Sequence, residues 1–257
     1  MLRAPIYRGF LINFASMNQI VQPLYEDNHL LIVNKPAGVL IQGDSTGDKP
    51  LVEHCKDYIK KKYNKPGAVF LHPVHRLDRP VSGVIVFART SKALERMNKI
   101  FATRKVQKTY WAIVKKHPPQ KKGKLVSWLV KDTKRNVTTA YSEPVDGGLK
   151  AETNFKWMGK LNNHHLIEVE PLTGRPHQIR VHLSEMGSPI RGDLRYGFPK
   201  PNPDKSINLH ARRLYFEHPI KKEPLIITAG VPTDQFWEQF LTLDDVKVKD
   251  KYVDKMY

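Results

Sequence analysis

The chain has 257 residues, of which 40% are hydrophobic and 26% are charged, a balance that predicts a globular domain with a substantial core. Its 43 Lys and Arg residues against 25 Asp and Glu residues give a formal charge of +18, which favours a polyanionic partner and salt-sensitive binding. Nucleic acid is therefore the expected partner rather than a membrane surface, because no apolar run approaches a membrane span and no long basic amphipathic helix is evident. Cys55 is the only cysteine, which excludes an internal disulfide framework and a cysteine zinc site and fits a cytoplasmic protein.

The first half of the chain opens with residues 1–23, which we expect to form an N-terminal extension or strand, with Met17 as an alternative start to Met1. Apolar runs at 69–71 and 84–87 predict buried strands on either side of a charged loop. Apolar spacing and capping signals predict four further elements: a strand over 24–34, a helix over 51–62, a helix from an N-cap at Ser91 to Arg104, and a strand over 108–114.

In the second half, predicted strands outnumber helices. They cover 126–130, 165–170, 212–216, 225–228 and two runs between 137 and 158 that flank Asp146-Gly147-Gly148, a hairpin signal. Pro176 suits the first turn of a helix that ends near Gly187, and residues 243–257 form a charged tail. This pattern predicts an α+β domain built on a mostly antiparallel or mixed sheet with flanking helices.

The most unusual segment is the loop at residues 75–83, between the two apolar runs. It places the carboxylate of Asp78 between the guanidinium groups of Arg76 and Arg79, next to buried strands. Burying a charge costs free energy unless the charge is paired. The loop is therefore either a structural ion pair at a strand end or a functional site, and the charge pattern alone does not decide between them.

The residues of this loop, His-Arg-Leu-Asp followed by Ser-Gly, resemble the signature of the RluA-type RNA pseudouridine synthases, in which the Asp is catalytic. Other segments match in the family's order: NKPAG at 34–38, KTYWAIV at 108–114, TGRPHQIRVH at 173–182, LHA at 209–211 and FEHP at 216–219. The resemblance covers roughly residues 24 to 240, and it departs from the family at Val81, where Thr is usual.

The resemblance implies one catalytic domain, residues 24–242, on a long bent sheet whose two lobes flank a central RNA-binding cleft, with no S4 domain. It also implies that the chain isomerises a uridine to pseudouridine in structured ribosomal or transfer RNA. This isomerisation needs no metal and no organic cofactor, and the sequence has no dinucleotide or P-loop motif. We expect a monomer whose partner is RNA.

Three residues are implied as catalytic: Asp78, Tyr110 and Arg180. Asp78 acts either as a nucleophile or as a base, which the sequence leaves open. Tyr110 would stack on uracil, although a core aromatic is the plainer interpretation, and Arg180 would orient Asp78, although it could instead bind phosphate. The residues expected to bind substrate are His75, Arg76, Arg175, His177, Gln178 and Ile179. Among these, Arg76 would fill the space left by a flipped uridine.

Two alternatives belong to other functional classes. The first is a non-catalytic RNA-binding or ribosome-assembly protein on the same fold. The second is a basic glycosidase, which usually needs two carboxylates, and no obvious partner for Asp78 lies in these motifs.

Overall fold

The computed structural model describes residues 20–247. The candidate start residues, most of the expected N-terminal extension and the tail from residue 248 onward lie outside the described residues.

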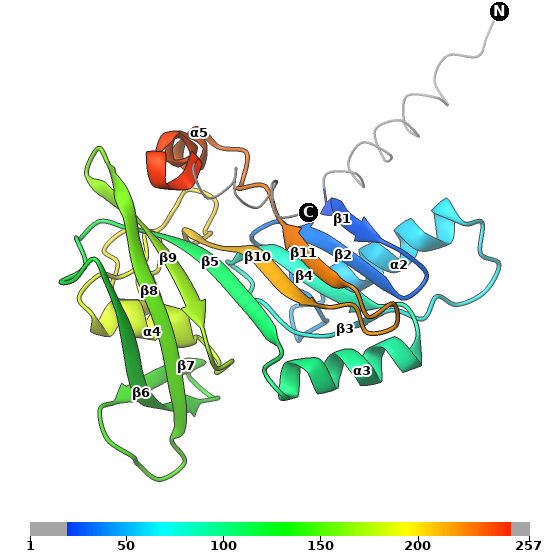
Figure 1. Cartoon of the computed structure of the whole chain (residues 1–257), viewed down its shortest axis with the longest axis horizontal. Helices are drawn as coiled ribbons and strands as arrows, with labels where there is room; N and C mark the ends of the chain where they lie inside the picture. The colour runs from blue at the N-terminus through cyan, green and yellow to red at the C-terminus, as the bar shows by residue number, and fades with distance from the viewer. Residues whose placement is uncertain (1–19, 248–257) are drawn as a thin grey trace, which may run out of the picture.

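Figure 1 shows a sheet bent into two halves: β6–β9 run steeply, whereas β1, β2, β4, β10 and β11 lie across the other half. The strands are β1 (Pro23–Glu26), β2 (Leu30–Lys35), β3 (His72–Pro73), β4 (Ser82–Ala88), β5 (Val106–Val114), β6 (Lys122–Asp132), β7 (Val137–Tyr141), β8 (Leu149–Leu161), β9 (His164–Pro171), β10 (Leu209–Glu217) and β11 (Pro224–Thr228). The helices are α2 (Leu51–Lys62), α3 (Ser91–Ala102), α4 (Gln178–Glu185), η1 (Leu194–Tyr196), α5 (Gln235–Glu238) and η2 (Gln239–Thr242).

The strands form one 11-stranded sheet in the order β1-β2-β4-β10-β5-β9-β8-β6-β7, with β11 against β10 and β3 against β4. The strand pairs between described residues are antiparallel except β4 and β10, which run parallel. At this junction Gly83 has a φ of +114° and approaches Ala211 so closely that an added Cβ would lie 2.3 Å from the Ala211 carbonyl oxygen. The predicted α+β fold with a mostly antiparallel, mixed sheet is confirmed.

The core around β2 and β4 shows why both read as continuous apolar runs. Alternate side chains of a strand face opposite sides of the sheet, and both sides are covered here. One side packs Leu30, Ile32, Val84 and Val86 with Met97 of α3. The other side packs Leu31, Val33, Ile85 and Phe87 with Leu51, Cys55 and Ile59 of α2. The predicted strand at 84–87 and the helix at 51–62 are thus confirmed, and Cys55 is a buried thiol.

Several predicted boundaries in the first half were wrong, for local reasons. The strand over 24–34 is two strands, because the Asp27 carboxylate accepts the backbone N–H groups of His29 and Leu30, both at 2.8 Å, and turns the chain. Residues 69–71 form no strand, and pairing with β4 begins only at His72. The N-cap of α3 is Thr90, whose hydroxyl accepts the Ala93 N–H, and not Ser91.

Two predictions in the second half were also wrong. Strands β7 and β8 do not pair with each other, since β6 lies between them: Trp128 of β6 pairs with Tyr141 on one side and Lys150 on the other. β6 is long enough, at 11 residues, to accept both neighbours. Pro176 precedes α4 instead of lying in its first turn.

The described chain ends against the sheet: Leu243 and Val246 pack with Trp111, Trp237 and Phe240. Within residues 20–247, no helix is long and apolar enough to cross a membrane.

Candidate active site

Asp78 lies in the loop between β3 and β4, and its side chain is 31% exposed. The loop turns sharply, because the Val81 N–H donates to the Asp78 carbonyl at 3.0 Å. Beneath it, the fully buried ammonium of Lys35 donates to three carbonyl oxygens, those of Pro36, Val39 and Arg79, at 2.8 to 3.1 Å. The motif at 34–38 therefore holds the residue that follows the candidate catalytic Asp.

Arg180 reaches Asp78 from α4, 102 positions further along the chain. Its Nη1 donates to Asp78 Oδ2 at 2.9 Å, while its Nε and Nη2 donate to the two carboxylate oxygens of Asp193 at 2.7 and 2.9 Å. Burial lowers the pKa of Arg180, but the hydrogen bonds and charges of Asp193 and Asp78 outweigh burial and raise it. The guanidinium is thus a permanent cation shared by two carboxylates.

His177, the residue immediately before α4, lies beside Asp78. Its Nε2 lies 3.7 Å from Asp78 Oδ2 and 3.4 Å from the ammonium of Lys131, and its Nδ1 lies 2.7 Å from the hydroxyl of Tyr196. Burial lowers the pKa of His177 to about 4, and the charge of Asp78 opposes this shift.

Tyr110 of β5 belongs to an apolar cluster beside the loop. The cluster includes Leu77, Val81 and Ile179, so that Val81, where the family usually has Thr, is buried against other apolar groups. Burial and the charge of Asp78 raise the pKa of Tyr110 well above its ordinary value, so its hydroxyl stays protonated. The site therefore combines one partly exposed carboxylate with an apolar wall and a phenol.

The other residues expected from the sequence have different environments. Arg76 is exposed on the loop surface, and the Nε2 of His75 accepts the Val86 N–H at 3.2 Å while its ring stacks on Phe101. Burial, aided by Lys108, lowers the pKa of His75 to about 3, so this ring is a neutral link between the loop and β4.

Gln178 and Ile179 are buried at the start of α4. The Gln178 amide oxygen accepts the Thr173 hydroxyl and the Arg175 N–H, and its nitrogen donates to the Glu152 carbonyl and the Thr153 hydroxyl. Gln178 thereby ties the preceding loop to β8, while Arg175 is half-buried and donates its Nε to the Lys150 carbonyl.

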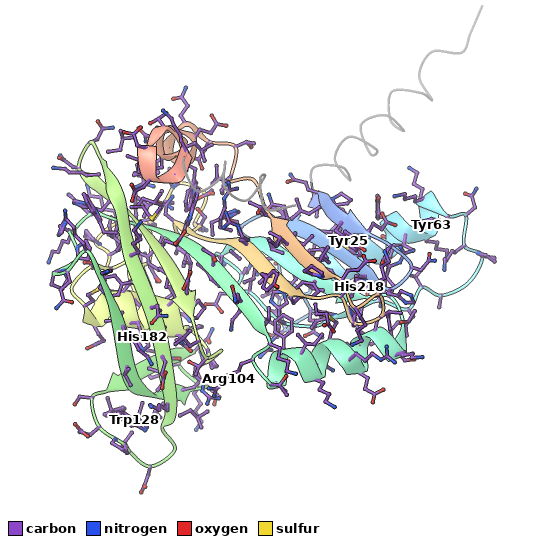
Figure 2. The ribbon with its side chains drawn as sticks, viewed as in Figure 1. Tyr25, Tyr63, Arg104, Trp128, His182 and His218 are labelled. Carbon is purple, nitrogen blue, oxygen red and sulfur yellow. The ribbon has the colours of Figure 1, made fainter. Side chains whose placement is uncertain are left out.

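A second polar contact fixes α4 over the sheet. Figure 2 labels His182 on α4, beside β6 and β8. Its Nε2 lies 2.8 Å from the Ser127 hydroxyl of β6 and its Nδ1 lies 2.9 Å from the Thr153 hydroxyl of β8. Burial lowers the pKa of His182 to about 4, so both bonds involve a neutral ring.

Sequence reasoning missed three residues of the site: Asp193, Lys35 and Tyr196. Lys35 lies inside a motif that the resemblance already includes, which was a usable signal. Asp193 and Tyr196 lie in a loop and a short 3-10 helix outside the motifs that resemble the family, and only the fold brings them to Arg180 and His177. Within residues 20–247, no three His, Cys, Asp or Glu side chains gather as a metal site would require.

Comparison with known proteins relates this chain to a family. Residues 29–185 match the family model described as RNA pseudouridylate synthase. The chain is 34% identical over 225 residues to a ribosomal large subunit pseudouridine synthase C of Vibrio cholerae, covering 85% of this chain and 68% of that protein. It is 29% identical over 241 residues to a tRNA pseudouridine synthase C of the same organism, covering 87% and 95%.

Among solved structures, human RNA pseudouridylate synthase domain containing 4 shares the fold, with a TM-score of 0.72 at 23% identity over 94% of this chain and 98% of that chain. The family model spans more than half of the chain, and the motif residues that resemble the family meet around Asp78 in the fold. The chain therefore belongs to the RNA pseudouridylate synthase family.

Proposed function

We propose that this protein isomerises a uridine of structured ribosomal or transfer RNA to pseudouridine, with Asp78 as the catalytic carboxylate. The ion pair of Asp78 with Arg180, at 2.9 Å beside Tyr110, is the observation that carries the proposal. The names of the Vibrio cholerae relatives, one acting on ribosomal RNA and one on transfer RNA, support these two substrate classes.

The reaction breaks the bond between C1′ of the ribose and N1 of uracil, forms a bond between C1′ and C5, releases the proton from C5 and adds a proton to N1. Atoms and electrons balance without an oxidant. Asp78 attacks as a nucleophile or removes a sugar proton as a base, and both roles need a carboxylate oxygen facing the nucleotide. Arg180 holds one Asp78 oxygen, and Tyr110 offers a ring for stacking on the base.

A uridine within an RNA helix must leave its stack to reach Asp78, at a cost of roughly a few kcal/mol. Arg76 is exposed two positions before Asp78, where it can occupy the vacated space. Five further residues complete the proposed substrate site. His177 lies beside the carboxylate and Ile179 belongs to the apolar wall. The others shape the loops that face the RNA: His75, Arg175 and Gln178.

The bend between the two halves of the sheet, which meet near Asp78, is our proposed place for the RNA (Figure 1). The charge of +18 supplies long-range attraction for the phosphates. We propose that the protein acts as a monomer in the cytoplasm, a compartment that fits its one buried thiol. We also propose that it uses no metal or organic cofactor, because the isomerisation is redox-neutral.

Tritium release from RNA labelled at uracil C5 tests the proposal, because this tritium leaves only when C5 becomes bonded to the sugar. Ribosomal and transfer RNA should be assayed separately, with Asp78→Asn as the control. We expect release from one of the two pools by the wild type and none by the variant. Binding without release from either pool would favour the RNA-binding alternative, and binding that does not weaken with added salt would contradict a role for the +18 charge.

A further inference from the structure

Tyr196 lies at the end of η1 and is 6% exposed. Its ring lies against the guanidinium of Arg180, with 4.9 Å between the Arg180 Cζ and the ring centroid. Its hydroxyl accepts from the backbone N–H of Thr138 at 2.9 Å and lies 2.7 Å from Nδ1 of His177, and the side chain of Thr138 also interacts with it. The phenol therefore connects β7, Arg180 and the histidine beside Asp78.

The neighbours of Tyr196, taken together with the carboxylate near Nε2 of His177, favour one direction for the hydrogen bond between Tyr196 and His177. A backbone N–H can only donate, so the oxygen of Tyr196 accepts from Thr138. The phenol's own proton is then free to point at His177 Nδ1, at a distance typical of a good O–H···N bond. When Nδ1 accepts, the neutral imidazole carries its proton on Nε2.

Nε2 faces two groups with opposite requirements, the carboxylate of Asp78 at 3.7 Å and the ammonium of Lys131 at 3.4 Å. Lys131 already donates to the side chain of Asn136, so it does not depend on His177 for a partner. An N–H on Nε2 is attracted to the carboxylate, and the 3.7 Å separation is one that can shorten when substrate binds.

The backbone of His177 also indicates a functional constraint. Its φ of +55° lies in the left-handed region, which costs free energy for a residue with a β-carbon. His177 is the residue before α4, and it does not use its side chain as a cap. The strained backbone instead directs the ring between Tyr196 and Asp78.

We propose that Tyr196 fixes His177 as the Nε2–H tautomer and that His177 thereby acts as a positioning residue for the Asp78 carboxylate. This inference rests on the proposed function for its catalytic consequence, although not for the tautomer itself. Because Nε2 already carries a proton, His177 does not accept the proton released from C5. Its role is to help hold Oδ2 of Asp78, the oxygen that also accepts from Arg180.

The contact between Tyr196 and His177 depends on pH, because protonating Nδ1 requires the Tyr196 hydroxyl to turn away. The charged groups around the ring are Asp78 and Arg180, together with Lys131 of β6 and Arg195 of η1. Burial keeps the pKa of His177 at about 4. Replacing Tyr196 by Phe removes the donor to Nδ1, so we expect the pKa of His177 to rise, while burial of the ring still holds it below the ordinary value of about 6.5.

Nitrogen NMR of protein labelled with ¹⁵N-histidine tests the tautomer directly, with His177→Gln to assign the signal. We expect neutral His177 protonated on Nε2 from pH 8 down to about 5.5, since its pKa lies well below that range. In Tyr196→Phe, the same signal should titrate at a higher pH than in the wild type, and the neutral ring should lose its preference for the Nε2–H tautomer. A wild-type signal from the Nδ1–H tautomer, or a wild-type titration near pH 6.5, would overturn the inference even if Tyr196→Phe fails to fold.

Turnover adds the catalytic readout. At pH 7.5, Tyr196→Phe should lower kcat roughly tenfold with KM nearly unchanged, and kcat should fall further as the pH drops through the new titration. In a His177→Gln background, which offers an N–H that does not titrate, Tyr196→Phe should add no such pH dependence. If the additional dependence persists in that background, it arises elsewhere and the positioning role is wrong. Absence of tritium release by the wild type would count against the proposed function, while the NMR test of the tautomer would stand.

Discussion

Asp78 and Asp193 bind the same guanidinium in opposite environments. Asp193 is 1% exposed and takes two short hydrogen bonds from Arg180, whereas Asp78 is 31% exposed and takes one. A carboxylate whose two oxygens are both engaged and buried has no oxygen left for a substrate. Asp78 keeps one oxygen free of Arg180 and open to the surroundings, which is the arrangement that a reactive carboxylate needs.

This comparison shows that proximity to an arginine does not identify a catalytic acid. Exposure and the number of hydrogen bonds separate the two environments: Asp193 neutralises and orients Arg180 in the interior, and Arg180 then presents Nη1 to Asp78. The pairing of Asp193 with Arg180 is what allows a cation to be buried beside the apolar cluster of Tyr110.

The largest expected effect on activity comes from Asp78→Asn. The amide keeps the size of the side chain but cannot attack or remove a proton, so turnover should fall on the order of 1,000-fold or more. RNA affinity should stay within a few-fold of the wild type, and the free energy of unfolding should change by less than about 1 kcal/mol because the ion pair is partly exposed. Tritium release, a binding titration and urea unfolding measure the three quantities. Collapse of binding or folding would make Asp78 a structural residue.

Asp193→Asn should lower stability more than Asp78→Asn does and turnover less. It leaves the buried guanidinium without its main counter-charge, so we expect a loss of about 3 kcal/mol in the free energy of unfolding. Turnover should fall by about 10- to 100-fold, because Arg180 no longer holds a fixed position. Asp146→Asn, at an exposed loop position, serves as the matched control and should change neither quantity. An Asp193 variant as stable as the wild type would disprove the division of roles.

Lys35→Met tests the support beneath the Asp78 loop. It keeps the apolar length of the side chain but removes the donor of the Pro36 and Val39 carbonyl groups, while the Arg79 carbonyl keeps only the Gly38 N–H, at a cost of about 2 kcal/mol. Urea unfolding measures the loss, and turnover should fall with it because the Arg79 carbonyl lies next to Asp78. Lys60→Met, at an exposed position on α2, is the control. Equal effects of the two substitutions would mean that Lys35 does not hold the loop.

The effect that is smallest at neutral pH concerns acid stability. The folded-state pKa of His182 is about 4, below the unfolded value of about 6.5, so the unfolded chain binds more protons between these values. Stability therefore falls as the pH drops from 6.5 towards 4, by up to about 1.4 kcal/mol per pH unit for this residue. His182→Gln should flatten the slope, and the exposed His72→Gln should leave it unchanged. Equal slopes in wild type and His182→Gln would contradict the buried neutral ring.

Much of the fold was predictable where one physical signal dominates. The apolar runs of β2 and β4 identify strands covered on both sides, and the spacing over 51–62 gives α2 with its observed bounds. The predictions failed where side-chain hydrogen bonds or long-range pairing override local patterns, as at Asp27, which splits one strand into two, and at β6, which separates β7 from β8.

The site was predictable only as far as its motifs extend. Asp78 and Arg180 come from matched segments, and the fold joins them. Asp193 could not be singled out among 25 acidic residues, because its function depends on a burial and a contact that arise only after α4 and η1 pack together. The roles of Gln178 and His182 likewise depend on hydroxyl groups of β6 and β8.

The most direct test is single-turnover tritium release from one RNA by wild type, Asp193→Asn and Asp78→Asn, each first shown to be folded. Our account predicts rapid release by the wild type, slower but measurable release by Asp193→Asn, and none by Asp78→Asn. Measurable release by Asp78→Asn together with none by a folded Asp193→Asn would contradict it, because the buried carboxylate would then be the one required for the chemistry.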